Sequence, residues 1–341
     1  MGCICDETNH RKIILKVVRQ FFLYNFVNHA GTGCTEKNGV AVGFGAYSIL
    51  GANDAGYACG CVVTHNLIHD SPHAAVLYGG NDHRFEFNEV HDFLVESDDL
   101  GGFYTNNGWC SYGNLVRYNF IHHTSHALGI YLDDADSGDT LEGNIMYRMG
   151  TGAAVGGGHD NILRQNVAIE CPGGFGIDAR GVSRKYDQDS GMLRDYQKLN
   201  PVNPPWSTRF PTLPNLLENN PAMPNGCVLE RNIVTGTAKA ADLRGKPEHF
   251  KGVTLKDNAA LTPEDLRLKD LAKLDFRMAA DAPAFAPALG RARPGRPVLR
   301  LRRRERRAAR RLRGGQSLDA ARGRLHQDGR GRPADGCPLL L

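Results

Sequence analysis

Acidic, aromatic and basic residues recur at matching places in a repeated pattern, and carbohydrate chemistry needs side chains of these kinds. Four segments align on their apolar positions: residues 103–106, 130–133, 154–157 and 177–180. The alignment predicts two columns of side chains on one outer face. The first column reads Tyr104, Tyr131, Val155 and Asp178, and the second reads Asn106, Asp133, Gly157 and Arg180. Positions that merely face water tend to carry small polar or charged residues, so these columns indicate a binding surface.

Asp133 and Asp178 are the first candidates for catalysis because they lie on predicted strands, where Asp has a low propensity. They are two repeats apart, and repeats spaced by about 4.8 Å separate their backbones by roughly 10 Å. Side chains that lean together reach the roughly 5 to 9.5 Å that glycosidases use, which leaves retention and inversion both open. One carboxyl protonates the glycosidic oxygen while the other activates water or attacks carbon. A neighbouring carboxylate such as Asp134 raises their pKa, as a general acid near neutral pH requires.

Other residues near these columns have side chains suited to binding a sugar. The rings of Tyr104, Tyr131 and Trp109 offer flat apolar faces to pyranose rings. Gly157 leaves space between the two carboxylates, and Arg180 can bond hydroxyls or keep a neighbouring Asp ionised. The full set of predicted substrate-binding residues is Tyr104, Tyr131, Trp109, Asn106, Asp99, His159, Asp160, Arg180 and Trp206.

Several polar residues also have a structural interpretation. Asp98, Asp99, Asp134 and Asp136 lie in predicted tight corners, where Asp commonly bonds its own backbone, and this role is favoured for each of them. Other histidines are spaced as metal ligands would be, but we expect them to follow Asn at corners and to bond the backbone: His65, His69, His122, His123 and His126. No metal site is therefore predicted, and His159 stays open between binding and structure.

The element that positions these residues is a short repeat centred on Asn. It recurs at Asn66, Asn88, Asn119, Asn144, Asn166 and Asn232, with a spacing of 22 residues in two of the gaps. A period of this size with insertions at one corner is typical of a solenoid. Apolar residues alternate over three to five positions before Gly, Asn or Asp interrupts them, which indicates strands. The sequence therefore predicts an all-β, single-stranded right-handed parallel β-helix of the pectate lyase kind, with stacked Asn side chains.

Composition divides the chain into segments with different expected roles. Residues 1–38 are an entry segment that looks truncated, and residues 39–285 form the β-helix. A helical and Pro-rich excursion at residues 182–225 interrupts it. We expect Trp206 to anchor this excursion over one face of the solenoid, where the excursion would form one wall of a substrate groove. Residues 290–341 are rich in Arg and predict a disordered tail.

The charges differ between the tail and the body of the chain. From position 291 the chain has 16 Arg and 4 acidic residues, a net charge of +12, whereas the remaining 25 basic and 33 acidic residues give −8. The acidic body disfavours nucleic acid as a partner of the β-helix. Lys16, Arg19 and Gln20 interrupt the apolar stretches near the start, so neither a signal peptide nor a membrane span is visible. We expect a monomer.

The chain resembles a group of bacterial parallel β-helix proteins related to glycoside hydrolase family 141. The matching phrases are LYGGNDHRFEFNEVHDF from Leu77, ESDDLGGFYTNNGW from Glu96, GIYLDDADSG from Gly129, GGGHDN from Gly156, GIDARG from Gly176 and PPWSTRFP from Pro204. The resemblance implies an extracellular or periplasmic enzyme that cleaves a plant or algal polysaccharide with Asp133, Asp134 or Asp178. The group usually has Arg in place of His159, and it has a longer amino-terminal portion with a signal and usually no Arg-rich tail.

Two other functions remain open. A polysaccharide lyase or epimerase on the same fold needs a base, Tyr131 or His159, and a cation that neutralises a uronate, Arg180 or bound calcium. A hydrolase needs no cofactor, so calcium is expected only for the lyase. The other possibility is a non-catalytic glycan-binding or structural β-helix, in which Asp133→Asn and Asp178→Asn leave binding unchanged.

Overall fold

The computed structural model describes most of the chain between positions 60 and 282. The described residues are 26–27, 47–49, 60, 62–71, 73–95, 97–105, 108–237, 239–279 and 281–282. The chain divides into two compact units, Met1–Leu299 and Arg300–Leu341, and the second lies wholly outside the described residues. The predicted tail at residues 290–341 and most of the predicted entry segment at residues 1–38 also lie outside them.

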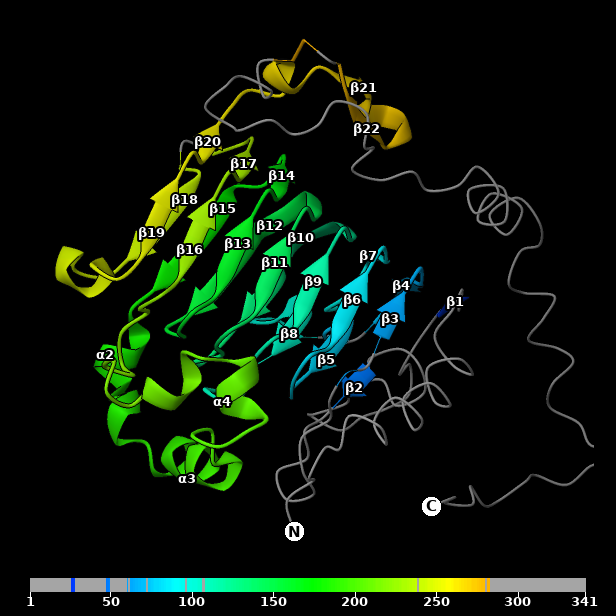
Figure 1. Ribbon diagram of the computed structural model, residues 1–341. Coiled ribbons are helices and arrows are strands. Elements are labelled where there is room, and N and C mark those ends of the chain that lie inside the picture. Colours follow the sequence, from blue (N-terminus) through cyan, green and yellow to red (C-terminus); the bar gives the residue numbers. More distant parts are fainter. Residues whose placement is uncertain are drawn as a thin grey trace, which may run out of the picture. The chain divides into compact units, whose positions relative to one another are not determined.

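Short parallel strands stack as the rungs of a coil, which is the right-handed parallel β-helix that the sequence predicts (Figure 1). A thirteen-stranded sheet contains β1 (Phe26–Val27), β2 (Tyr47–Ile49), β4 (Leu67–His69), β5 (Val76–Tyr78), β7 (Glu89–His91), β8 (Gly101–Thr105), β10 (Phe120–Leu132), β12 (Ile145–Gly156), β14 (Val167–Ile169), β15 (Gly173–Asp178), β17 (Ile233–Val234), β18 (Ala241–Arg244) and β20 (Ala259–Ala260). A seven-stranded sheet contains β3 (Val62–Thr64), β6 (Arg84–Glu86), β9 (Leu115–Arg117), β11 (Thr140–Glu142), β13 (Ile162–Arg164), β16 (Val228–Glu230) and β19 (Thr254–Lys256). An antiparallel pair, β21 (Leu268–Asp270) and β22 (Asp275–Met278), follows them.

Strands β10 and β12 are long enough to cross a bend, so each belongs to two faces of the solenoid. Their first parts pair with β7 and β14, and their last parts pair with β8 and β15. A register shift between Thr124 and Leu128 marks the bend in β10. We call the face made of β5, β8, the last parts of β10 and β12, β15 and β18 the groove face.

In the seven-stranded sheet, each short strand from β3 to β16 gives its central side chain to the core. In the seven-stranded sheet the central residues are in register across the rungs, and they are fully buried from β3 to β16: Val63, Phe85, Val116, Leu141, Leu163 and Leu229. Their neighbours on each strand point outward because side chains alternate along a strand. Leu255 of β19 continues the column, but its side chain is 48% exposed.

The predicted asparagine ladder is present at one corner of each rung. Each amide nitrogen donates to the amide oxygen of the next rung, from Asn66 through Asn88, Asn119, Asn144, Asn166 and Asn232 to Asn258. The Nδ2 atom of Asn144, for example, lies 2.9 Å from Oδ1 of Asn166 and 2.8 Å from the carbonyl oxygen of Val116. Buried amides therefore have their hydrogen-bonding capacity filled by the stacking itself.

A helical excursion leaves the solenoid after β15. It contains α2 (Arg180–Arg184), a 3-10 turn η1 (Tyr186–Gln188), α3 (Ser190–Leu199), α4 (Trp206–Arg209) and a 3-10 turn η2 (Leu213–Asn215). The carboxylate of Asp189 caps α3 by accepting a hydrogen bond from the Met192 amide. Further 3-10 turns are η3 (Pro247–Phe250), η4 (Glu264–Leu266) and η5 (Leu271–Lys273). Among the helices of the described residues, none is long and apolar enough to cross a membrane.

Candidate active site

The register of the groove face corrects the alignment made from the sequence. Tyr131 pairs with Tyr104 as expected, but on its other side it pairs with Ala154, which in turn pairs with Gly176. The alignment is therefore wrong by one position at β12 and by two at β15. The glycine-rich sequence of β12, with small residues facing both ways, contains no clear alternation that would fix its register.

The corrected column brings both candidate carboxylates together. Asp133 follows Leu132, whose partner is Val155, so Asp133 lies beside Gly156, and Gly156 pairs with Asp178. The glycine between the two carboxylates is thus Gly156 and not Gly157. A Cβ atom at Gly156 would lie 3.0 Å from both Cζ of Arg180 and Oδ1 of Asp133. Glycine is required there because the space beside it is filled by the charged groups.

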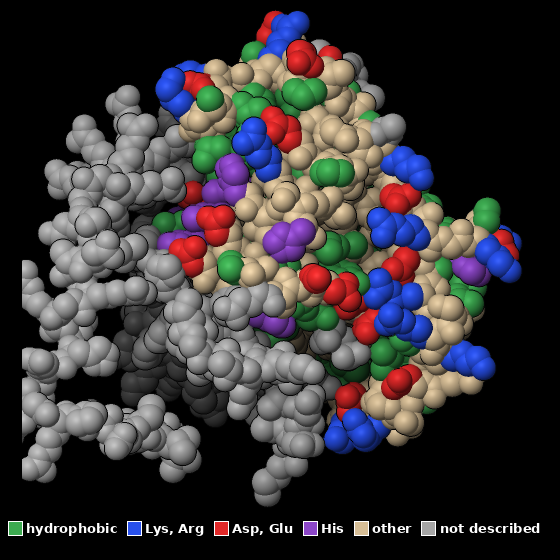
Figure 2. Space-filling model, turned by 180° about the vertical axis from the view of Figure 1, so that it is seen from behind, with side chains coloured by type: hydrophobic (Ala, Val, Ile, Leu, Met, Phe, Trp, Pro, Cys, Tyr) green, Lys and Arg blue, Asp and Glu red, His purple; other side chains and the backbone are tan. Residues whose placement is uncertain are grey.

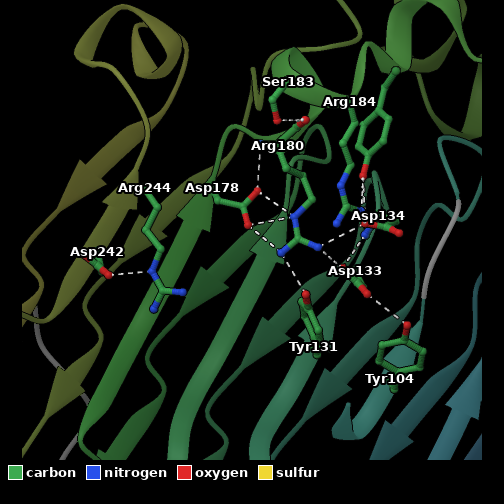
Figure 3. A network of polar contacts seen from close by, with 11 residues as sticks. Tyr104, Tyr131, Asp133, Asp134, Asp178, Arg180, Ser183, Arg184, Asp242 and Arg244 are labelled. Atoms are coloured by element: carbon green, nitrogen blue, oxygen red, sulfur yellow. Dashed lines mark hydrogen bonds and ion pairs between the residues drawn. The ribbon is translucent and has the colours of Figure 1, made fainter. Parts of the chain in front are cut away.

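Arg180 occupies the space between the two carboxylates (Figure 3). Its Nε atom lies 2.9 Å from Oδ2 of Asp178, and Nη2 lies 2.7 Å from the same oxygen. Its Nη1 atom donates to Oδ1 of Asp133 and, over 3.1 Å, to Oδ1 of Asp134. Nη2 also donates to the Tyr131 hydroxyl over 2.9 Å. One guanidinium therefore pairs with all three predicted catalytic carboxylates.

Further donors surround Asp133 and Asp134. The Tyr104 hydroxyl donates to Oδ2 of Asp133 over 3.0 Å. Asp134 accepts hydrogen bonds from Arg184 and, over 2.8 Å, from the Tyr186 hydroxyl. Arg184 and Tyr186 come from the excursion, so this segment is tied to the groove face through Asp134.

The two adjacent acids have pKa values shifted in opposite directions. Burial raises the pKa of Asp133, and the negative charge of Asp134 adds to this, although a Tyr131 hydrogen bond and the Arg180 charge oppose it. Burial would also raise the pKa of Asp134, but hydrogen bonds from Tyr186 and Arg180 outweigh it and lower that pKa. Such a divergence is typical of paired acids that take different roles.

A groove of about 230 Å³ opens beside this cluster. It is lined by Asp99, Leu128, Tyr131, Thr151, Ala154, Val155, Gly176, Ile177, Asp178, Arg180 and Arg244. Leu128 is in register with Gly173, five residues before Asp178, so the groove extends for roughly 16 Å along the strands. Thr151, Ala154 and Gly176 have small side chains, and their size creates the hollow. An elongated, shallow groove of this kind can accept part of an extended chain.

Three of the predicted binding residues lie in the groove, and one supports it from below. Tyr131, Arg180 and Asp99 line the groove, with Asp99 at the end away from the charged cluster. Tyr104 is 92% buried and contacts Tyr131 edge-on at 5.7 Å between ring centroids, so it supports Asp133 and does not offer a face to a sugar. Asn106 lies outside the described residues.

The other predicted binding residues lie under the excursion or belong to it. Trp109 is 1% exposed and cannot stack on a ligand, because it packs in a buried cluster with the excursion. Trp206 packs against the same cluster and not along the groove, so the excursion touches the groove through α2 instead. His159 is 1% exposed, and Asp160 accepts a hydrogen bond from the Tyr112 hydroxyl over 2.7 Å. His159 is therefore buried, Asp160 has a hydrogen-bond partner within the fold, and neither residue lines the groove.

The sequence analysis missed four residues of this site: Arg184, Tyr186, Asp242 and Arg244. Arg244 pairs in register with Asp178, and its Nε atom lies 2.9 Å from the carboxylate of Asp242. A signal for it was present, because Asp242-Leu243-Arg244 repeats the spacing of Asp178-Ala179-Arg180 on the next rung. The contacts of Arg184 and Tyr186 depend on how the excursion folds back, which no local pattern predicts.

The histidine predictions were partly wrong. His69 and His122 lie on strands β4 and β10 and not at corners, and their rings stack on His91 between them. His123 lies at a corner with a φ of 61°, and its Nδ1 atom faces Nδ1 of His122. His126 does contact the backbone, with its Nε2 atom 3.1 Å from the carbonyl oxygen of Leu94. His65 lies at a corner as expected, where Nδ1 contacts the Thr64 hydroxyl.

Comparison with known proteins supports the fold and adds no activity. A family model described as right handed beta helix region matches residues 47–184, which include the groove strands up to β15 and helix α2. No curated protein matches the chain. The β-helix is a fold that carries several kinds of chemistry, so function has to be argued from the charged cluster and its groove.

Proposed function

We propose that this protein is a carbohydrate-active enzyme, a glycoside hydrolase that cleaves a plant or algal polysaccharide bound in the groove. The observation that carries the proposal is the sharing of the Arg180 guanidinium by Asp133 and Asp178 at one end of that groove. Paired carboxyls supply the acid and the base or nucleophile of glycoside hydrolysis. The resemblance to glycoside hydrolase family 141 supports the same activity and an extracellular or periplasmic location.

The surroundings of the two carboxyls suggest their roles. Asp133 is the more buried of the two and has a raised pKa, as the general acid that protonates a glycosidic oxygen requires. Asp178 lines the groove and forms a double hydrogen bond with Arg180. It is therefore placed to act as the base that activates water or as the nucleophile.

Hydrolysis by this pair requires Arg180 to move. Its guanidinium fills the space between the carboxyls, which is the space that a scissile bond has to enter. The Arg180 side chain is 21% exposed and projects from the first residue of α2, so it can turn out without a change in the strands. Displacement by a sugar would leave Asp133 and Asp178 facing each other across the bound bond.

The charges near the groove favour a neutral glycan over a uronate. Four carboxylates surround this end of the groove, against three guanidiniums: Asp133, Asp134, Asp178 and Asp242, with Arg180, Arg184 and Arg244. A fifth carboxylate, that of Asp99, lines the far end of the groove. Arg180 is committed to three acids, which leaves it poorly placed to neutralise a substrate carboxylate. A lyase or epimerase needs such a cation, and because Arg184 and Arg244 are also paired, with Asp134 and Asp242, the hydrolase is the better proposal.

The test is reducing-sugar release from a panel of plant and algal polysaccharides by the full-length chain. Asp133→Asn and Asp178→Asn are each expected to lower the rate at least a hundredfold, whereas the exposed corner variant Asp257→Asn should keep it. Unchanged rates in both groove variants would reject this pair of residues. Calcium-dependent release of an ultraviolet-absorbing unsaturated product would identify a lyase, and binding without turnover would identify a non-catalytic glycan-binding protein.

A further inference from the structure

Histidines occupy one outward column on three successive rungs, on a face apart from the groove. His69, His91 and His122 pair in register on β4, β7 and β10. Their rings stack nearly parallel, with centroids 4.9 and 4.7 Å apart. The next two rungs carry Tyr147 and Ile169 in the same column, so the solenoid does not itself require histidine there. Figure 2 shows several histidine side chains close to one another on one part of the surface, with acidic side chains beside them.

Three potential ligands meet at this column. One ligand atom each from Glu89, His91 and His122 lies within 4.8 Å of the others. Glu89 comes from the neighbouring column of β7, two residues before His91, so both side chains project from the same face of the strand. The side chains of His91 and His122 are 10% and 5% exposed, and that of Glu89 is 24% exposed. The imidazoles are thus largely buried, while the carboxylate remains reachable from solvent.

The second nitrogen of each imidazole is oriented by the following corner residue. Nδ1 of His91 lies 2.6 Å from the carboxylate of Asp92, and Nδ1 of His122 lies 2.6 Å from Nδ1 of His123. A hydrogen on each of these Nδ1 atoms leaves the Nε2 lone pair available. A carboxylate that accepts from the far nitrogen of a metal-binding histidine is a common arrangement, because it fixes the tautomer and the ring orientation.

The spacing of one donor pair, Glu89 and His122, suits a tetrahedral ion. Nε2 of His122 lies 3.4 Å from Oε1 of Glu89. Two ligands bound to zinc at about 2.1 Å in tetrahedral geometry lie about 3.4 Å apart. Rotation of the Glu89 side chain and the imidazole of His91 can shorten the wider separations.

We propose that Glu89, His91 and His122 bind one zinc ion, which His69 flanks on the preceding rung. Two imidazoles and one carboxylate are a donor set that zinc accepts, with a fourth position left for water. The cluster lies on the first part of β10, before the bend between Thr124 and Leu128, whereas the groove begins at Leu128. The zinc site is therefore separate from the proposed hydrolytic site and does not depend on it.

The test is equilibrium dialysis of the full-length protein, stripped with a chelator, against Zn²⁺ alone. His122→Tyr places in the column the residue that the next rung carries, so the fold should tolerate it, and we expect it to lose one equivalent of zinc. Glu89→Gln should raise the dissociation constant of this zinc ion at least tenfold. Asp92→Asn, which removes the partner of His91, should have the same effect. His249→Gln, a histidine of η3 outside the column, is the matched control and should bind like the unchanged protein.

Substitution by Co²⁺ distinguishes this site from a site formed by cysteines, of which the chain has nine. A site of nitrogen and oxygen ligands gives visible cobalt bands without the intense near-ultraviolet absorption of a thiolate ligand. We expect those bands in the unchanged protein and in His249→Gln and their loss in His122→Tyr. Equal zinc equivalents and affinities in the unchanged protein, His122→Tyr and Glu89→Gln, with circular dichroism showing folded variants, would overturn the proposal. Thiolate absorption alone would also overturn it.

Discussion

Asp133 and Asp178 lie two rungs apart in one column of the solenoid, with Gly156 between them, and both accept hydrogen bonds from the same guanidinium. The column brings the two carboxyls near each other, with the Arg180 guanidinium between them. This arrangement explains why two acids can occur on one outer face without a large electrostatic cost.

Gly156→Ala tests how tightly this cluster is packed. The new Cβ atom would lie 3.0 Å from Cζ of Arg180, Oδ1 of Asp133 and the Asp134 amide nitrogen. We expect a loss of about 1 to 3 kcal/mol in the free energy of unfolding, measured by urea denaturation. Gly176→Ala is the control, because its Cβ atom meets only the Asp242 carbonyl oxygen at 3.4 Å. Equal losses in the two variants would contradict the packing described for Gly156.

Asp134→Asn tests the ion pairs that join the excursion to the groove face. The folded-state pKa of Asp134 is lowered, so its stabilising effect is present above the unfolded pKa of 3.8 and is lost as the pH falls through the folded value. The difference in unfolding free energy between the unchanged protein and Asp134→Asn should therefore be largest near pH 7 and should shrink below about pH 4. Urea unfolding at several pH values measures it, and a constant difference would argue against the ion pairs.

Tyr131→Phe tests Asp133 as the general acid. The Tyr131 hydrogen bond lowers the pKa of Asp133, so its removal should raise that pKa further. An acid with a higher pKa stays protonated to a higher pH, and the alkaline limb of the pH–rate profile should move upward. Tyr118→Phe, at a corner of the solenoid between β9 and β10, serves as the control. An acidic limb that moves while the alkaline limb stays would point to another acid.

Asn144→Ala tests the ladder, because Asn144 has ladder partners on both sides. It donates to Asn166 and Val116 and accepts from both the amide side chain and the backbone of Asn119. Its removal leaves buried groups without partners, and we expect a loss of about 3 kcal/mol or more. Asn258→Ala should cost about 1 kcal/mol, because that residue is only partly buried. Thermal unfolding compares the two, and the reverse order would contradict this account.

The sequence predicted the features that repeat and missed those that depend on long-range folding. The Asn spacing revealed the rungs, since each rung requires the same amide at the same corner. The register around β12 was misjudged because Ala153, Ala154 and Gly156 give little contrast between the inward and outward positions. Arg180 appeared among the candidates, but its position between the carboxyls follows from the way α2 leaves β15. The burial of Trp109 and His159 follows from the excursion that covers them.

The amide ladder has a consequence for how the molecule fluctuates. Each Asn bonds only to the rungs beside it, so cooperativity passes along the solenoid from neighbour to neighbour. Fraying is then expected to start at terminal rungs such as that of Leu255 and to travel inward, while amide hydrogens of β11 and β13 exchange slowest. Asp133 and Asp178 lie on these central rungs. The distance between their carboxyls should therefore be kept while the terminal rungs unfold locally.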